Sequence, residues 1–417
     1  MSTPNRISEL EDLEKRSRLS EDRESTQQHA LELLTLYRQI DEDRALSVLH
    51  NLVKKRLQQA ETVTALIRLV LTWADDYPLE STSSLPKREA ILKAVRDAAM
   101  GKITVEREYA LSVRELAKLY ESRSDLTLAS LEIRNLAPEQ IGSLSRSERI
   151  EMILYQVRLL LDTGDLIRSE ISIRRITPRS LHHEEVPPTL HVLYYYLASK
   201  IFNLRGNILK ASSAYLDLWI ASRKVEGDHE LREHISTALS DAARYCLLSE
   251  LGPERTTLAA KIMIEYSKLE DKPIPEADLL QKTLETLLIE MEHGDSLPAC
   301  EVTEKYVPNW RSVLKERIVD HNLFIVSKFF STVQLSRLAE LVQAQQDVAE
   351  TRLCALFERN ILFCKIDRQT GSVSLRREQD PVNTSNDWAF GLMRTIDKLE
   401  KAVHLIEVER SFSGFNE

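Results

Sequence analysis

Apolar residues recur at helical spacing along most of the chain. Residues 148–163 show the pattern clearly, since one aliphatic face carries Ile150, Ile153, Val157 and Leu160. A spacing of three or four residues places these side chains on one side of a helix, where they can pack against a neighbour. The pattern repeats with few breaks from about residue 27 to residue 308. The sequence therefore predicts a long series of amphipathic helices.

Three stretches of this region look like copies of one unit of two helices. They lie 40 and 42 residues apart and cover residues 119–131, 159–171 and 201–213. A two-helix unit with a period near 40 is typical of helical-repeat proteins, whose units bury their apolar faces only by stacking. We therefore predict a mainly α fold in which residues 27–308 form a right-handed, TPR-like helical solenoid.

Each copy carries the residues that a tight turn between two helices requires. The first turn residue is expected to take the left-handed conformation that ends a helix, and the second to cap the next helix. These turn pairs are Ser124-Asp125, Gly164-Asp165 and Gly206-Asn207. Four residues after the capping residue a small side chain lets the two helices pack closely, and these residues are Ala129, Ser169 and Ala211.

The first 26 residues differ from the repeats because they are densely charged, as in the run ELEDLEKRSRLSEDRES at positions 9–25. Mixed charge with few apolar residues buries too little surface to order a chain. A flexible tail is favoured for residues 1–26, and the start of a solvated helix is the alternative.

The pattern changes after Pro308. Residues 313–330 read as a helix, followed by a short polar break, two further helices and two strands with alternating side chains. The predicted ranges are 336–343 and 347–360 for the helices and 362–367 and 372–376 for the strands. Gly371 suits the left-handed position of the loop between the strands. This order predicts a winged-helix domain over residues 309–377.

The strands of such a domain have free edges, and a neighbouring protein can extend a small sheet through backbone hydrogen bonds. We expect the hairpin to contact a partner there. The candidate partner-binding residues of the hairpin are Phe363, Lys365, Val373 and Leu375.

A polar linker over residues 378–386 leads to a last amphipathic helix over residues 387–412. Its apolar positions step by 4, 3, 4 and 3 residues and are Leu392, Ile396, Leu399, Val403 and Ile406. This is the heptad spacing of a helix that packs against other helices. A single helix cannot bury such a face alone. It either folds back on its own domain or binds helices of other proteins.

Composition narrows the class of protein. Only 10 glycines and 13 prolines occur in 417 residues, which argues against a turn-dense β fold. The net charge of −9 argues against a chain that binds nucleic acid through overall charge. The sequence shows no signal-peptide pattern, no apolar run near 18 residues and no CxxC pair among its four cysteines. We expect a protein of the cytoplasm and nucleus without a membrane segment.

The sequence shows no pattern typical of an active site. His182, His183, Glu184 and Glu185 form its only dense cluster of metal-ligand types, and we interpret them as a solvated loop beside prolines. Gly101-Lys102 does not fit a phosphate loop, because Arg96 stands where that motif needs glycine. His321-Asn322 is interpreted as a structural polar contact. We predict a non-enzymatic chain with no catalytic residues, metal or cofactor.

Nucleic-acid binding is the main rival, since winged helices often recognise DNA. The second helix of the predicted domain, residues 347–360, would enter the groove, yet its net charge is −1. A helix beside phosphates should be basic. The hairpin region 361–377 carries a net charge of +3, which is more often a solvated edge. We therefore expect no nucleic-acid partner.

Several segments, in one colinear order, resemble a family of PCI-domain scaffold proteins, the one that contains non-ATPase regulatory subunit 12 of the proteasome lid. These segments are residues 98–130, 149–181, 309–330, 361–375 and 386–406. The resemblance implies a non-catalytic scaffold of the 26S proteasome regulatory lid that positions the deubiquitinating subunit. A paralogous scaffold of the signalosome is the alternative.

The resemblance also implies the partners. These would be the other PCI subunits of the lid and its deubiquitinase heterodimer, with further contact to the ATPase ring and the core particle. Winged helices of such a hetero-oligomer would line up edge to edge, and the terminal helix would enter a bundle of several subunits' tails.

Overall fold

The computed structural model describes residues 3–19, 23–78, 84–225, 232–268, 275–295, 297–298, 301–376 and 381–413. The chain divides into two compact units, residues 1–246 and 247–417. Within the described residues, no helix combines the length and the apolar character that crossing a membrane requires. The predicted mainly α fold is confirmed, since three short strands are the only sheet in these residues.

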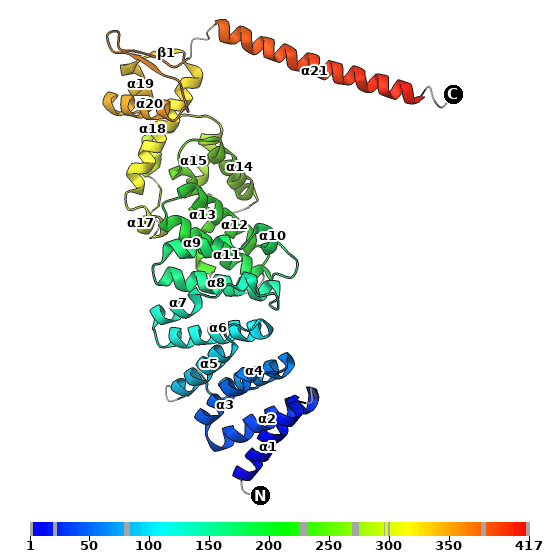
Figure 1. Cartoon of the computed structure of the whole chain (residues 1–417). Helices are drawn as coiled ribbons and strands as arrows, with labels where there is room; N and C mark the ends of the chain where they lie inside the picture. Colours follow the sequence, from blue (N-terminus) through cyan, green and yellow to red (C-terminus); the bar gives the residue numbers. More distant parts are fainter. Residues whose placement is uncertain are drawn as a thin grey trace. The chain divides into compact units, whose positions relative to one another are not determined.

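Unit 1 is a succession of helices (Figure 1). The α-helices in chain order are α1 (Thr3–Leu19), α2 (Arg23–Ile40), α3 (Glu42–Lys54), α4 (Ala60–Asp75), α5 (Leu85–Ala99), α6 (Glu106–Ser122), α7 (Leu126–Arg134), α8 (Arg146–Asp162), α9 (Leu166–Arg174), α10 (Pro178–Leu181), α11 (Pro188–Leu204), α12 (Ile208–Ser222) and α13 (Arg232–Leu248). Two 3₁₀ turns, Ile103–Val105 and Pro138–Gln140, precede α6 and α8. The apolar faces of successive helices meet in continuous cores, as repeat stacking requires.

The three repeat turns have one backbone geometry. Ser124, Gly164 and Gly206 all have left-handed φ angles, of 64°, 81° and 72°. In each turn the next amide donates to the carbonyl five residues earlier, at 2.9–3.0 Å, as Asp165 does to Leu160. This is the Schellman motif that ends a helix. The predicted left-handed positions are confirmed.

The predicted capping and packing residues fare differently. The three small residues Ala129, Ser169 and Ala211 are completely buried, as expected. Of the capping residues, only Asp165 accepts a hydrogen bond from a backbone amide of its helix, that of Arg168 at 3.3 Å. Asp125 and Asn207 make no such bond, because backbone hydrogen bonds alone close these turns.

The charged amino-terminal segment differs from the expected flexible tail, since residues 3–19 form α1. This helix packs on α2 and buries the carboxylate side chain of Glu14. Lys55 Nζ lies 2.8 Å from Glu14 Oε2, and the Tyr37 hydroxyl donates to Glu11 Oε1 at 2.8 Å. The prediction of a tail is wrong for these residues because their charges are paired with groups distant in sequence, which a local pattern does not show.

Unit 2 begins with four short to medium helices and ends in a winged helix and a long helix. Its elements are α14 (Pro253–Ser267), α15 (Pro275–Leu284), α16 (Met291–Asp295), α17 (Glu301–Tyr306), α18 (Trp310–Phe329), β1 (Thr332–Gln334), α19 (Leu335–Val342), α20 (Gln346–Glu358), β2 (Lys365–Asp367), β3 (Ser372–Ser374) and α21 (Pro381–Ser413). The predicted solenoid extended to residue 308, whereas α14–α17 belong to the unit of the winged helix. The segment between α15 and α16 is hydrogen-bonded to α18 of the winged helix, through Leu287 and Ile289, and this ties these helices to unit 2.

The winged helix contains one strand more than the sequence predicts. Residues 332–334, expected as part of a polar break, form β1, and the antiparallel sheet has the order β1-β3-β2. Val333 pairs with Val373, which pairs with Ile366 on the other side. Strand β1 escaped prediction because only one of its three residues is apolar and buried.

The last helix begins earlier than predicted. Helix α21 starts at Pro381, so part of the expected linker over residues 378–386 is helical, and residues 378–380 lie outside the described part. Proline is well placed at a helix start, because the first amide there needs no partner.

Candidate assembly surfaces

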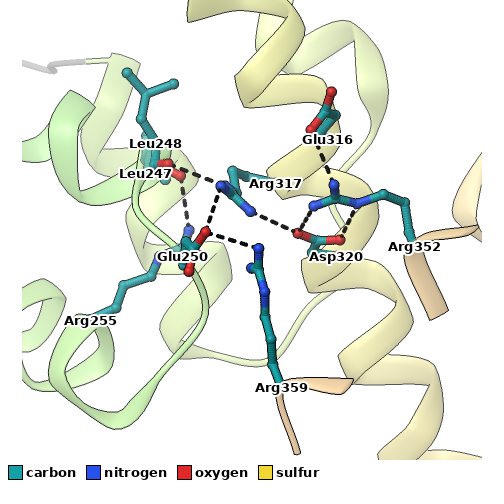
Figure 2. A network of polar contacts seen from close by, with 9 residues as sticks. All are labelled: Leu247, Leu248, Glu250, Arg255, Glu316, Arg317, Asp320, Arg352 and Arg359. Atoms are coloured by element: carbon teal, nitrogen blue, oxygen red, sulfur yellow. Dashed lines mark hydrogen bonds and ion pairs between the residues drawn. The ribbon is translucent and has the colours of Figure 1, made fainter. Parts of the chain in front are cut away.

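A buried carboxylate joins the two main helices of the winged helix (Figure 2). Asp320 on α18 is only 1% exposed. Arg352 on α20 donates to both of its oxygens, with the Nε–Oδ1 bond at 2.8 Å, and Arg317 Nη1 lies 3.2 Å from Oδ2. These hydrogen bonds raise the pKa of the Arg352 guanidinium. A buried carboxylate held this way fixes α20 against α18.

The same network holds the segment that enters unit 2. Arg317 Nε donates to the Leu248 carbonyl at 3.3 Å. Glu250 Oε1 forms ion pairs with Arg317 Nη2 at 3.4 Å and with Arg359 Nη2 at 3.1 Å. Figure 2 shows these groups converging from α18, from the end of α20 and from the 247–250 segment. The winged helix is thereby bonded to the chain that precedes α14.

His321 and Asn322 hold a second extended segment against α18. The Asn322 amide group accepts from Ile289 N at 2.9 Å and donates to Ile289 O at 2.8 Å, and His321 Nε2 lies 3.0 Å from Leu287 O. Burial lowers the pKa of His321 to about 4. The neutral ring therefore donates a hydrogen bond, and the prediction of a structural polar contact is confirmed.

The four hairpin residues predicted to bind a partner occupy two different environments. Lys365 on β2 is exposed, and Phe363 is half-buried with its ring edge-on to Phe357 at 6.2 Å between centroids. Val373 and Leu375, in contrast, are buried in the domain's own core. For these two side chains the expectation of surface contact is wrong, because β3 is the central strand and its inner face covers the core.

The edges of the sheet are therefore β1 and β2. Each is three residues long, and among the described residues each is paired on one side only. Such edges can accept a strand from another protein. The candidate strands for contact with a partner are therefore β1 and β2, rather than the hairpin strands β2 and β3.

Helix α21 exposes its whole apolar stripe. The five predicted residues Leu392, Ile396, Leu399, Val403 and Ile406 are between 52% and 64% exposed. The alternative in which the helix folds back on its own domain is not the arrangement in this structure. Ordinary soluble chains leave single apolar residues outside, but rarely a continuous row of them.

Sequence reasoning missed five further large apolar residues on the described part of α21. Trp388, Phe390 and Met393 are 74%, 72% and 68% exposed, and Val382 and Leu405 are 64% and 66% exposed. Trp388 lies four residues before Leu392 and so on the same side of the helix, whereas the heptad spacing itself points to Ala389. Phe390 and Met393 are three residues apart and lie to the side of the stripe. The first half of α21 is thus apolar on more than one side.

Three arginines of the winged helix form ion pairs within the protein. Arg368 Nη2 lies 2.5 Å from Glu350, Arg359 pairs with Glu250, and Arg352 with Asp320. These three guanidinium groups are therefore less available to phosphates, because each already has a carboxylate partner. This pairing weakens the case for a nucleic-acid surface.

The histidine and acidic cluster at 182–185 forms local contacts. His182 packs edge-on to His191 with 5.4 Å between ring centroids, and His183 Nδ1 accepts from the Glu185 amide at 3.4 Å. In the part of the chain that the structure describes, no three His, Cys, Asp or Glu side chains are grouped as a metal site requires.

Comparison with known proteins decides the family. A family model described as PSMD12/CSN4, N-terminal, matches residues 5–227, more than half of the chain. The chain belongs to the PSMD12/CSN4 family. A second model, the PCI domain, matches residues 302–377 and so covers α18 to β3.

Curated proteasome relatives of this PSMD12/CSN4 chain match it along nearly its full length, and a signalosome relative matches a smaller part of it. The 26S proteasome non-ATPase regulatory subunit 12 homolog A of Arabidopsis thaliana is 28% identical, covering 97% of this chain and 96% of the relative. The subunit 12 of Dictyostelium discoideum is 26% identical, covering 95% and 87%. The COP9 signalosome complex subunit 4 of Arabidopsis thaliana is 21% identical, covering 70% and 74%.

Proposed function

We propose that this protein is a non-catalytic scaffold subunit of the regulatory lid of the 26S proteasome. The observation that carries the proposal is the exposed apolar stripe of α21, in a chain whose relatives are named as proteasome non-ATPase regulatory subunits. The apolar stripe of such a helix becomes buried when helices of other chains pack against it. The protein acts by binding sister subunits and has no substrate of its own.

The energetics of α21 support an obligate partner. Burying one Leu, Ile or Val side chain stabilises an assembly by roughly 1.5–3 kcal/mol. For the five stripe residues this amounts to roughly 7–15 kcal/mol before ordering costs are subtracted. Inserting α21 into a bundle of helices from several subunits would bury the stripe and stabilise the assembly by this amount. A solvated α21 gains none of this stabilisation.

The two sheet edges support a second contact. A winged helix of a neighbouring PCI subunit can pair with β1 or β2 through backbone hydrogen bonds, and exposed Lys365 lies on β2. Unit 1 then extends as an arm of stacked helices that is free to meet other parts of the particle. In this role the protein organises the lid and positions its deubiquitinase heterodimer for ubiquitin-dependent degradation.

Further partners and the location of the protein follow from the same proposal. The arm would contact the ATPase ring and the core particle, and the protein would reside in the cytoplasm and nucleus as part of a hetero-oligomer. No nucleic acid, membrane or cofactor takes part in this function.

Native mass spectrometry of the tagged chain, purified from its own cells, tests the proposal. We expect the chain in a complex with the proteasome lid and core subunits. A chain recovered as a free monomer, or one that turns over a substrate by itself, would contradict the scaffold role.

The signalosome is the second candidate, because subunit 4 of that complex also matches this chain. The same purification separates the two. A signalosome scaffold would be recovered with an activity that removes the ubiquitin-like modifier from cullins and without proteasome core subunits. The higher identity and coverage of the proteasome relatives favour the lid.

A further inference from the structure

Two cysteines of the winged helix lie on neighbouring segments. Cys354 is an exposed residue of α20, and Cys364 is a half-buried residue directly before β2. Both side chains are free thiols in this structure. The chain turns back over residues 359–362, between α20 and the segment that leads into β2. This reversal brings the two cysteines onto facing parts of the domain.

Two contacts show that the segment after the turn runs back along α20. Near the end of the helix, the Phe363 ring lies edge-on to Phe357 at 6.2 Å between centroids. Closer to the start of the helix, Arg368 Nη2 lies 2.5 Å from Glu350 Oε1. Residues 350, 354 and 357 are spaced by four and three positions and so share one side of the helix. Cys354 thus lies between the two contacts, on the side of α20 that faces this segment.

The Cys364 side chain points at the same part of the helix. Its sulfur lies 3.8 Å from the Leu353 carbonyl oxygen. That oxygen and the Cα of Cys354 belong to one planar peptide unit, which places the Cys364 sulfur within about 7 Å of that Cα. Cysteines joined by a disulfide have Cα atoms about 4.4–6.8 Å apart, so this geometry is compatible with a bond between the two sulfurs.

The two thiols differ in their access to solvent and in their chemistry. Cys354 is exposed, so a small oxidant can reach its sulfur. Burial raises the pKa of the Cys364 thiol, and the neighbouring Cys354 raises it further. The thiolate is the nucleophile in thiol oxidation, and oxidation follows exposure. Cys354 is therefore the first sulfur to react, and Cys364 is the second.

We propose that Cys354 and Cys364 form a redox-active dithiol, a modification site that hydrogen peroxide converts to an intramolecular disulfide. The Cys354 thiolate attacks one peroxide oxygen, the O–O bond breaks, and a sulfenic acid forms while the released hydroxide takes up a proton to become water. The Cys364 sulfur then attacks the Cys354 sulfur, the S–O bond breaks, and the hydroxide leaves with the Cys364 proton as a second water. The two thiols together lose two protons and two electrons, and one peroxide is reduced to two waters.

The disulfide would tie α20 to the segment that enters β2, which is one of the two edge strands of the sheet. A small thiol reductant would reverse the bond by thiol–disulfide exchange. The redox state of the pair would thereby control how firmly this edge of the winged helix is held. The inference goes beyond the proposed scaffold function and does not depend on it, because both cysteines belong to one domain of this chain.

Peptide mapping of the full-length chain after oxidation tests the bond. The reduced chain is treated with hydrogen peroxide, remaining thiols are alkylated, and the protein is digested without reductant for mass spectrometry. We expect a linked pair of peptides that contains Cys354 and Cys364 and that dithiothreitol separates. Two alkylated thiols, a Cys354 sulfinic or sulfonic acid beside an alkylated Cys364, or a bond from either cysteine to a different residue would overturn the inference.

Single substitutions test the assigned roles. In the Cys364→Ser chain the sulfenic acid of Cys354 has no second thiol, so dimedone should trap at least about fivefold more of it than in the wild-type chain. Cys246→Ser is the matched control, since Cys246 is completely buried in unit 1, and it should leave the linked peptide pair unchanged. Equal dimedone labelling of the wild-type and Cys364→Ser chains, with circular dichroism showing both folded, would contradict Cys364 as the second sulfur.

Discussion

The winged helix and helix α21 are neighbours in sequence, yet they treat apolar and charged side chains in opposite ways. In the winged helix, Val373 and Leu375 are buried and the charge of Asp320 is matched by two arginines. In α21, the heptad positions from Leu392 to Ile406 all face solvent. The winged helix supplies the packing and charge partners of its own buried residues. Helix α21 presents an apolar face that no other described element covers.

This contrast shows how a scaffold subunit divides its work. A domain with an internally satisfied core can fold before assembly and offer rigid edges, β1 and β2. A helix with an exposed stripe gains its stability only on association. Changes in the winged helix should therefore alter the stability of the free chain, whereas changes in α21 should alter assembly.

Deleting residues 386–417 should have the largest effect. We expect the chain to lose incorporation into the particle, because the whole apolar stripe is removed. The remaining domains should stay folded, with an unchanged thermal midpoint. Native mass spectrometry and circular dichroism measure the two outcomes. Normal assembly of the truncated chain would refute the bundle role of α21.

Asp320→Ala should strongly destabilise the winged helix of the free chain. The substitution leaves Arg317 and Arg352 without their shared carboxylate, and breaking a buried ion pair costs about 3–5 kcal/mol. Urea unfolding and hydrogen exchange of amides in residues 310–376 measure the loss.

Glu340→Ala is the matched control for this prediction. Glu340 pairs with Arg337 at 2.7 Å, but both side chains are about two-thirds exposed. Its removal should cost less than about 0.5 kcal/mol. Equal effects of the two substitutions would mean that the network in Figure 2 is not buried.

The stability of unit 2 should fall as the pH drops from about 6.5 to about 4. In the unfolded chain His321 takes up a proton near pH 6.5, whereas burial keeps it neutral in the folded chain down to a pKa of about 4. The unfolded state thus binds more protons in this window, and the loss reaches about 3 kcal/mol at the acid end.

His321→Gln isolates that histidine from other groups that titrate in the same range. Glutamine can still donate to the Leu287 carbonyl but carries no titratable proton. Unfolding of the two proteins, measured from pH 7 to pH 4, should show a shallower decline for the variant. Parallel pH profiles would contradict a buried neutral imidazole.

Ile396→Ala should leave the stability of the free chain almost unchanged. Ile396 is already half-exposed, so we expect the free energy of unfolding to change by less than about 0.5 kcal/mol. Incorporation should weaken nonetheless, by a measurable increase in the free fraction at limiting concentration. Lys398→Ala, on the polar side of α21, is the control that should leave incorporation unchanged.

Local signals predicted much of the fold. The left-handed turn residues Ser124, Gly164 and Gly206 were identifiable because few residues accept that conformation and the turn repeats. Helical periodicity located the helices of the winged helix. The candidate site was identified less completely, since the stripe of α21 was found but Phe390 and Met393 were not.

Long-range pairing caused the failures. Helix α1 is ordered through contacts of Glu11 and Glu14 with residues 26 and 41 positions away, and charge composition alone indicated a tail. Strand β1 has too few residues for an alternating pattern, and its pairing with β3 exists only in the folded domain. The same pairing makes β3 the central strand. Val373, which was expected to contact a partner, therefore lies in the core.

The order of amino acids shows which residues need to leave water, because hydrophobic periodicity and turn chemistry are local properties of the chain. What covers those residues becomes visible only in the folded protein. The fold closes the core over Val373, surrounds Asp320 with arginines, and leaves the apolar stripe of α21 uncovered. The reason is that burial depends on which distant elements meet, and those contacts are set by the packing of the whole unit rather than by any one segment.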